Sequence, residues 1–505
     1  MAPRTASCAF PAGLPLKRAA EHPIASVRHD VRSWSLTSVI SVALRCTGCA
    51  ARVDPSEPGA RSPFRCPNTD RAPHVDHVLA WSPVDAGVTQ WPSDSTINPF
   101  VRYRTLQHSY WLSRALGGTD DEHVARVARL DNAIAVVAGT GFVITPIRPL
   151  DTASARLGVE MWAKDDTRNV AGSHKARHLM GLLLHLDVRR VGARAQLAIA
   201  SCGNAALAAA TLTRAARRPL QVFVPPSANV VVLEKLRALG ASITECPRIP
   251  GDPPGDPCIH RFHQAVVKGA LPFCVQGPEN GLTIDGGATL GHELADQIAV
   301  LGRVPDRLFV QVGGGALGSS VYRGLVDAHR LGVIERVPKM HFVQSEGAAP
   351  LARAWRKVCA RAMQSLRRNE PGTTPIDDAA CAMSLADPTA HAAVEEALRH
   401  AATHRSLYMW PWEQEPTSVA TGILDDETYD WLALVHAMLM TGGWPIVATE
   451  SQLERAGELA NADSGGAEPD ETGAASLAGV IALRADALMA DDECVMVLLT
   501  GVRRN

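Results

Sequence analysis

Short apolar runs alternate with longer amphipathic stretches along most of this chain. The runs are continuous, as in strands that are buried on both faces, and the stretches between them repeat their apolar residues at helical spacing. Helices between such strands imply right-handed crossovers in parallel sheets, so the pattern predicts an α/β fold. The predicted strands are GFVIT (141–145), VEMWAK (159–164), QLAIAS (196–201), LQVFVP (220–225), SITECP (242–247), LPFCVQ (271–276), RLFVQVGGG (307–315), MHFVQSEG (340–347), WPIVATE (444–450) and ECVMVLLTG (493–501).

The N-terminal part of the chain does not follow this pattern. Residues 1–34 mix Pro, Ala, Arg and Ser without periodicity, and we expect a poorly ordered leader there. A strand-like run begins at residue 35, and a linker rich in Pro and Ser precedes the helical pattern that starts after residue 98. We therefore predict a small segment with its linker at 35–95 and a large domain at 96–505.

Composition and charge exclude several classes of protein. With 46% hydrophobic and 20% charged residues among 505, the chain has the composition of a soluble globular protein. Its formal net charge of -2 creates no basic field, so we expect neither nucleic acid nor an anionic membrane as a partner. The 11 cysteines are scattered and follow no convincing secretory signal, which indicates a reducing, cytoplasmic setting. No apolar run reaches the roughly 18 residues that a membrane span needs.

Three cysteines in the N-terminal segment have the outline of a zinc ribbon. Cys46 and Cys49 form a C-x-x-C pair, and after an interval typical of ribbons comes Cys66-Pro-Asn-Thr69, in which Thr69 occupies the place of the fourth cysteine. Three residues further along could complete a tetrahedral site: Asp70, His74 and His77. The alternative is a degenerate ribbon that has lost its metal and is held by packing. We expect this alternative, with zinc bound in clearly substoichiometric amounts.

One lysine lies directly behind a Gly-Ser turn. In KDDTRNVAGSHKAR (164–177), Lys175 opens a stretch whose apolar residues recur at helical spacing. The positive end of a helix dipole disfavours an ammonium group and favours a bound anion, so this lysine is a candidate nucleophile that could form an imine. The alternative is an ordinary helix start, with Ser173 as the cap and Lys175 as a solvated side chain.

A strand, a tight turn and a helix start follow one another at residues 196–206. The turn presents backbone N–H groups that could bind a carboxylate, and the Asn204 amide could donate to a phenolic oxygen. The alternative is a plain helix cap by Asn204. The predicted substrate-binding residues are Ser201, Cys202, Gly203 and Ala205.

Glycines and a threonine follow two other predicted strands. Gly313, Gly314 and Gly315 precede a helix that we expect to start near Ser319, so their N–H groups could converge on one phosphate beside a helix dipole. The loop has neither the Lys-Ser pair of a P-loop nor the spacing of a dinucleotide site, which favours a small phosphate-bearing cofactor over ATP or NAD. After the last strand, Thr500 places a hydroxyl where open α/β sheets bind ligands. The alternatives are a glycine turn that only permits close packing and an exposed terminal threonine.

Together and in this order, these segments resemble the fold type II pyridoxal phosphate enzymes, the tryptophan synthase beta chain-like group, and most closely its threonine synthase branch. The resemblance covers roughly residues 98–501 and includes NPFVRYR, TPIRPL, KDDTRNVAGSHKAR, ASCGNAA, FVPPSANVVVLEKLRALGA, GGGAL and LLTG. It implies two open twisted parallel sheets flanked by helices, with a smaller mobile subdomain inserted at about 190–290 of a catalytic domain. It also implies a homodimer with an amino acid substrate and pyridoxal 5'-phosphate as cofactor.

The resemblance assigns roles to the candidate residues. Lys175 would carry the Schiff base, Asn204 would face the ring hydroxyl, and Thr500 would face the pyridine nitrogen. The loop that would hold the phosphate consists of Gly313, Gly314, Gly315, Ala316 and Leu317. The degenerate ribbon also resembles one found ahead of some threonine synthases.

The expected activity is a lyase or synthase reaction, with elimination and replacement on an amino acid such as O-phosphohomoserine. GSHKAR departs from the family's GSFKDR, because it lacks the aspartate after the lysine and has His174 in place of an aromatic residue. His174 and Arg177 could supply charge to a substrate phosphate, although Arg177 could equally be a solvated helix residue. A β-eliminating ammonia-lyase of the serine or threonine dehydratase type is the second candidate, and an inactive paralogue that acts as a binding protein is the third.

Overall fold

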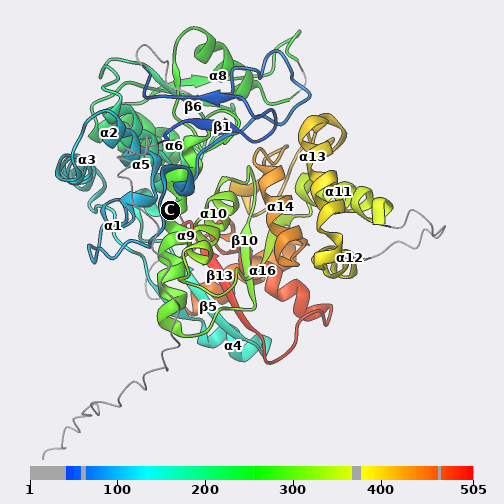
Figure 1. Cartoon of the computed structure of the whole chain (residues 1–505). Coiled ribbons are helices and arrows are strands. Elements are labelled where there is room, and N and C mark those ends of the chain that lie inside the picture. Colours follow the sequence, from blue (N-terminus) through cyan, green and yellow to red (C-terminus); the bar gives the residue numbers. More distant parts are fainter. Residues whose placement is uncertain (1–40, 58–63, 254, 367–376, 465–467, 504–505) are drawn as a thin grey trace, which may run out of the picture. The chain divides into compact units, whose positions relative to one another are not determined.

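The computed structural model describes residues 41–57, 64–253, 255–366, 377–464 and 468–503 (Figure 1). The leader expected at 1–34 lies outside the described residues. The domain boundaries predicted from the sequence, at residue 95 and around 190–290, stay predictions. None of the helices in the described part of the chain has the length and apolar character needed to cross a membrane.

The larger sheet has six strands in the order β12-β11-β10-β13-β5-β4. Neighbouring strands are parallel except at one edge, where β4 pairs with β5 antiparallel. Every residue of the central strands β10 and β13 is buried, which explains their continuous apolar sequences. The strands are β4 (Ile147–Pro149), β5 (Glu160–Asp165), β10 (Arg307–Gln311), β11 (Lys339–Ser345), β12 (Pro445–Ala448) and β13 (Cys494–Leu499).

The smaller sheet has four parallel strands in the order β8-β7-β6-β9. These strands are β6 (Leu197–Ala200), β7 (Leu220–Val224), β8 (Ser242–Glu245) and β9 (Leu271–Pro272). The two parallel sheets confirm the predicted α/β fold class. A third sheet, antiparallel and in the order β2-β1-β3, is formed by β1 (Leu44–Cys46), β2 (Arg52–Val53) and β3 (Leu79–Ala80).

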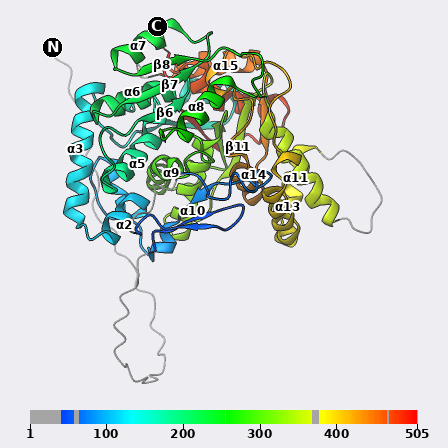
Figure 2. The same ribbon diagram turned by 90° about the horizontal axis from the view of Figure 1, so that it is seen from above.

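Helices cover the sheets and connect them (Figures 1 and 2). α16 (Glu471–Ala485) packs along β10, β11, β12 and β13, whereas α8 (Pro257–Val267) packs on β6 and β7. α5 (Lys175–Val188) packs against α6 (Asn204–Ala215) and α9 (Leu282–Leu301), and α9 packs against α10 (Ala316–Arg330). The other helices are α1 (Pro99–Arg102), α2 (His108–Ala115), α3 (Asp120–Ala138), α4 (Asp151–Leu157), α7 (Val230–Ala238), α11 (Pro350–Leu366), α12 (Asp378–Leu385), α13 (His391–Thr403), α14 (Trp431–Thr441) and α15 (Glu450–Ala462).

Each of the two larger sheets is surrounded by its own large hydrophobic core. One surrounds the larger sheet and includes Phe309, Trp355 and Trp431. The other surrounds the smaller sheet and α5, and it also takes in Leu44 and Leu79 of the antiparallel sheet. The N-terminal sheet therefore shares the core of the smaller parallel sheet.

The run GFVIT is not a strand, contrary to the prediction. Ile144 donates its backbone N–H to Ile97 O at 2.8 Å, and the Phe142 ring packs edge-on against Phe100 at 5.0 Å. This segment is therefore anchored to the chain ahead of α1, and the strand at the edge of the sheet is β4 instead.

Two other predicted boundaries were wrong. LPFCVQ is a strand only at β9, whose last hydrogen bond to β6 is from Phe273 N–H to Ala198 O at 2.8 Å, and a turn follows in which Asn280 N–H donates to Gln276 O at 2.9 Å. α10 begins at Ala316 rather than near Ser319, directly after the glycine loop.

Candidate active site

The ends of three parallel strands meet at one edge of the larger sheet. β5, β10 and β13 are neighbours and run in the same direction, so the residues that follow them come together. Ser173, just ahead of Lys175, forms a β-bridge with Gly501. Gln311, the last residue of β10, donates from Nε2 to Thr500 Oγ1 at 2.6 Å. The Lys175 turn, the glycine loop and Thr500 therefore share this edge, as the strand pattern predicted.

Lys175 is the first residue of α5 and is half-buried. His174 holds the N-cap position without a side-chain hydrogen bond, so the Ser173 cap considered from the sequence is not formed. Burial lowers the pKa of the Lys175 amine, and the nearby carboxylates of Asp425 and Asp430 oppose this shift only in part. A lysine with a lowered pKa is more often in the neutral form, which is the form that reacts with an aldehyde.

The turn after β6 faces the end of β13. The N-cap of α6 is Gly203 and Asn204 is the first helical residue, so Asn204 does not cap the helix. A Cβ added to Gly501 would lie 3.2 Å from Asn204 Nδ2, which places this amide beside the residue that follows Thr500. No side chain of the N-cap residue caps α6, and a helix start of this kind favours a bound carboxylate. Among the predicted substrate-binding residues, Ser201 and Gly203 are half-buried, Cys202 is exposed and Ala205 is buried.

The glycine loop leads directly from β10 into α10. Gly315 has a φ of 98°, in the left-handed region that favours glycine, and it serves as the N-cap of α10 without a side-chain cap. The loop is closely covered, since a Cβ on Gly313 would overlap Asp425 Oδ2 and one on Gly314 would lie 2.9 Å from Tyr429 Cδ2. Only residues without side chains fit here. The predicted phosphate loop, which continues through Ala316 and Leu317, therefore forms an uncapped helix start under a tight cover.

The cover is the acidic segment DDETYD, residues 425–430. Asp425 accepts a hydrogen bond from Gly314 N–H, and Asp430 donates its own N–H to Gly314 O at 2.9 Å. Burial raises the pKa of Asp425 to about 6 and that of Asp430 to about 7, although Lys175 and backbone N–H donors act in the opposite direction. Sequence reasoning missed both carboxylates, because nothing in their spacing connects them to a glycine loop far earlier in the chain.

Arg177 is neither solvated nor available to a substrate. It is fully buried, and it pairs with Asp166 Oδ1 at 2.8 Å and with Glu293 Oε1 at 2.5 Å. Lys164 Nζ joins the same group at 2.6 Å from Glu293 Oε2. Ala176, which stands where the family has the aspartate, is fully buried, and Arg177 is neutralised by carboxylates of Asp166, directly after β5, and of Glu293 in α9. The expectation that Arg177 could balance a substrate phosphate was therefore wrong.

His174 does not supply charge either. Its side chain is 7% exposed, and neither ring nitrogen has a hydrogen-bond partner in the described part of the chain. Burial, reinforced by the Lys175 charge, lowers the pKa of the imidazole well below its usual range. His174 is therefore neutral at physiological pH.

These groups suit pyridoxal phosphate. Lys175 offers an amine to the aldehyde, and the loop at 313–317 offers N–H groups and a helix dipole to the phosphate. The loop already binds an anionic oxygen, that of Asp425, at Gly314 N–H. Because Gln311 donates to Thr500 Oγ1, the Thr500 proton can point to another acceptor, such as a pyridine nitrogen.

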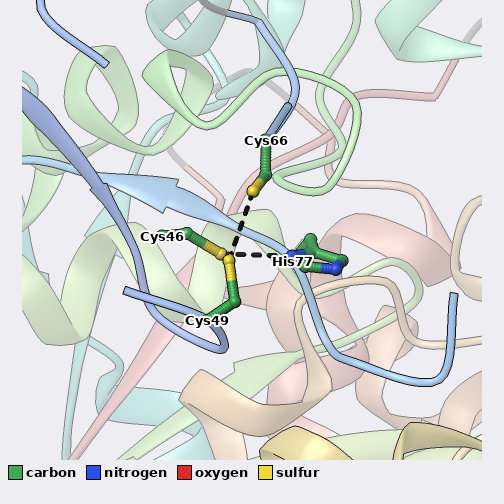
Figure 3. A group of neighbouring side chains, drawn as sticks. All are labelled: Cys46, Cys49, Cys66 and His77. Carbon is green, nitrogen blue, oxygen red and sulfur yellow. Dashed lines mark hydrogen bonds between the residues drawn. The ribbon is translucent and has the colours of Figure 1, made fainter. Parts of the chain in front are cut away.

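The N-terminal cysteines also come together. Cys46, Cys49 and Cys66 lie around one point, and the fourth group there is His77 (Figure 3). The other two residues considered as ligands, Asp70 and His74, are exposed.

Comparison with known proteins agrees with this geometry. The family profile described as "Pyridoxal-phosphate dependent enzyme" matches residues 140–403. Threonine synthase of Methanosarcina acetivorans is 25% identical over 71% of this chain and 74% of its own length. Cysteate synthase of Methanoregula boonei is 25% identical over 60% of this chain and 60% of its own.

A solved structure shares the fold. The processed form of threonine deaminase isoform 2 from Solanum lycopersicum matches 77% of this chain and 86% of its own, with a TM-score of 0.52 and 16% identity. At this identity the likeness shows the fold alone. With the family match and the threonine synthase relatives, the chain belongs to the pyridoxal-phosphate dependent enzymes and is threonine synthase-like, with pyridoxal 5'-phosphate as its cofactor.

Proposed function

We propose that this enzyme carries out elimination and replacement on an amino acid, with O-phosphohomoserine as the substrate. The observation that carries the proposal is the meeting of the half-buried Lys175 with the uncapped start of α6 at the end of β13. Lys175 supplies a base, and the start of α6 supplies a site for the substrate carboxylate. The similarity to threonine synthases over most of the chain supports the choice of substrate.

In this proposal each residue has a separate task. The turn of Ser201, Cys202, Gly203 and Ala205 binds the substrate carboxylate, and Lys175 Nζ takes the α-proton. General base catalysis of this kind is typically worth roughly 10²- to 10⁴-fold. When bound, pyridoxal phosphate draws electron density from the α-carbon, so that a β- or γ-substituent can leave. Thr500 is neutral and does not favour a protonated ring, which suits elimination and replacement better than transamination.

One observation favours a second candidate, an ammonia-lyase of the dehydratase type. Arg177 is committed to its buried ion pairs, His174 is neutral, and the segment 425–430 adds carboxylates beside Lys175. A dianionic leaving group without a counter-charge in such a pocket would cost several kcal/mol. A β-hydroxyl needs only a proton, and an acid such as Asp430, with its raised pKa of about 7, is suited to give one.

The two candidates differ in their products. The purified enzyme with pyridoxal phosphate should convert O-phosphohomoserine to threonine and release one phosphate per threonine. Formation of 2-oxobutanoate from threonine, without turnover of O-phosphohomoserine, would replace the first candidate with the second. Lys175→Ala, assayed in parallel, should be inactive toward either substrate.

A further inference from the structure

Three cysteines and one histidine enclose a point next to the three-stranded sheet. Cys46 ends β1 and Cys49 lies on the turn that follows, whereas Cys66 and His77 lie on the segment that leads to β3. The four ligand atoms all lie within 4.8 Å of one another (Figure 3). Cys46 Sγ is 3.4 Å from His77 Nδ1, and Cys49 Sγ is 3.5 Å from Cys66 Sγ. Ligand atoms of a tetrahedral site with Zn–S bonds of about 2.3 Å are separated by about 3.8 Å, so the four atoms fit around one zinc ion.

The imidazole of His77 is oriented as a metal ligand. Its Nε2 lies 3.1 Å from the carbonyl oxygen of Ala72, which can only accept a hydrogen bond. The ring proton is therefore on Nε2, and the lone pair of Nδ1 points at the cysteines. Histidine ligands of zinc usually have this arrangement, in which a carbonyl or carboxylate fixes the tautomer through the other ring nitrogen. Packing alone does not require it.

Hydrogen-bond donors surround the sulfur atoms. Asn68 donates from its backbone N to Cys66 Sγ and from Nδ2 to Cys49 Sγ, each at 3.5 Å. Such donors stabilise thiolates, the form in which cysteine binds metal. Thr69 takes no part, because its hydroxyl donates to Cys66 O at 2.8 Å. His77, which lies outside the usual spacing of a ribbon, thus takes the place of the fourth cysteine.

The backbone holds both halves of the cluster in place. Thr47 N–H donates to Val78 O at 2.9 Å, which ties the turn after β1 to the residue that follows His77. A Cβ on Gly48 would overlap Asp76 O, so the turn can approach this closely only at a glycine. Cys46, Cys66 and His77 are at most 5% exposed and Cys49 is half-buried, so the site is mostly buried as structural zinc sites are.

The segment that carries His77 connects both cores of the enzyme. Asp76 is 2% exposed and accepts from Trp431 Nε1 at 3.0 Å, and its own N–H donates to Ala402 O at 2.7 Å. Leu79 O lies against Gly281, where an added Cβ would overlap it. An ion bound to His77 would therefore fix a segment that is wedged between α13 and α14 on one side and the start of α9 on the other.

We propose that Cys46, Cys49, Cys66 and His77 bind one structural zinc ion, which clamps the segment 66–79 to the turn after β1. Binding releases the protons of the three thiols and leaves no open coordination position, so the ion has no role in the reaction itself. From the sequence we expected a degenerate ribbon without metal, because Thr69 stands in the place of the fourth cysteine. Since His77 offers the fourth ligand instead, this reason no longer holds.

Metal analysis of the full-length protein tests the proposal first. The protein, purified under reducing conditions without chelators or a histidine tag, should contain one zinc per chain. Growth with cobalt should give the intense visible absorption of a tetrahedral cobalt thiolate site. A folded, cofactor-loaded protein with less than about 0.1 zinc per chain would overturn the proposal. Iron in place of zinc would also overturn it. The same holds for a Cys49–Cys66 disulfide found by thiol mapping without reductant.

Variants identify the fourth ligand. His77→Ala should weaken zinc retention against a chromophoric chelator by more than the roughly 10- to 100-fold lost with a second-shell partner. His77→Cys should retain zinc and shift the cobalt spectrum toward that of a four-thiolate site. His74→Ala is the matched control, because His74 is exposed and lies outside the cluster. Equal zinc retention in His77→Ala and His74→Ala would overturn the assignment of His77 as the fourth ligand. If His77→Ala does not fold, the cobalt spectrum of His77→Cys tests this assignment instead.

Discussion

Replacing Asp425 with asparagine should tighten the binding of the cofactor's phosphate. The Asp425 carboxylate accepts the Gly314 N–H that we assign to the phosphate loop, and burial raises the pKa of this carboxyl to about 6. A bound phosphate dianion favours neutral Asp425, which is the major form only below this pKa. At pH 8, keeping the carboxyl protonated costs about 2.7 kcal/mol, because each unit between pH and pKa is worth about 1.36 kcal/mol.

The expected affinity therefore falls with pH in the wild type. Between pH 6 and pH 8 it should drop by about 50-fold, because half of the carboxyl is already ionised at pH 6. Asp425→Asn should bind about 100-fold more tightly than the wild type at pH 8 and lose this part of the pH dependence. Calorimetric titration with a cofactor analogue that lacks the aldehyde measures the effect without imine formation at Lys175. Asp426→Asn, in the same segment, is the control. It removes a charge that helps to raise the pKa of Asp425 but leaves that carboxyl able to ionise, so its affinity should still fall with pH. Equal slopes for Asp425→Asn and Asp426→Asn would refute the reasoning.

Three further predictions concern other parts of the molecule. Gly314→Asp should weaken cofactor retention, because it adds a negative charge where the phosphate binds and a side chain whose Cβ would lie 2.9 Å from the Tyr429 ring. Equal affinity of the variant and the wild type in a cofactor titration would contradict this. Glu293→Gln should lower the free energy of unfolding in urea by about 3–5 kcal/mol, since it leaves buried cations unpaired. Glu160→Gln, which affects an exposed pair with Arg303 at 3.0 Å and an exposed hydrogen bond from Trp162, should change it by less than about 1 kcal/mol. Similar losses in both variants would argue against the buried network. Asn68→Ala should reduce zinc affinity by roughly 10- to 100-fold in a chelator competition, and an unchanged affinity would show that its N–H···S bond does not support the metal.

The sequence predicted what depends on short-range pattern. Continuous apolar runs identified the buried strands, and the residues that follow β5, β10 and β13 were correctly expected to converge, because parallel strands end at the same edge of a sheet. Lys175, the glycine loop and Thr500 were predicted in this way, and they lie at that edge. The run GFVIT failed because its partner is Ile97 in a loop, and apolar sequence alone does not show whether a segment pairs with a sheet.

The rest depends on contacts between distant parts of the chain. Arg177 looked solvated or catalytic because Glu293, which neutralises it, comes from another helix. Asp425 lies on the glycine loop only in the folded chain. His77 was one of three candidates in the sequence, and only the folded segment brings its ring, rather than that of His74, to the cysteines. Spacing rules do not describe such long-range contacts.

The most direct test of the central claim is to locate the cofactor on the chain. The purified enzyme should show a visible imine absorbance band, and borohydride should abolish the band and leave a phosphopyridoxyl group that peptide mass spectrometry places on Lys175. Lys175→Ala, which removes a half-buried side chain at a helix start, should remain folded but carry no label and show no turnover. A label on another lysine such as Lys164, or undiminished turnover in Lys175→Ala, would contradict the account.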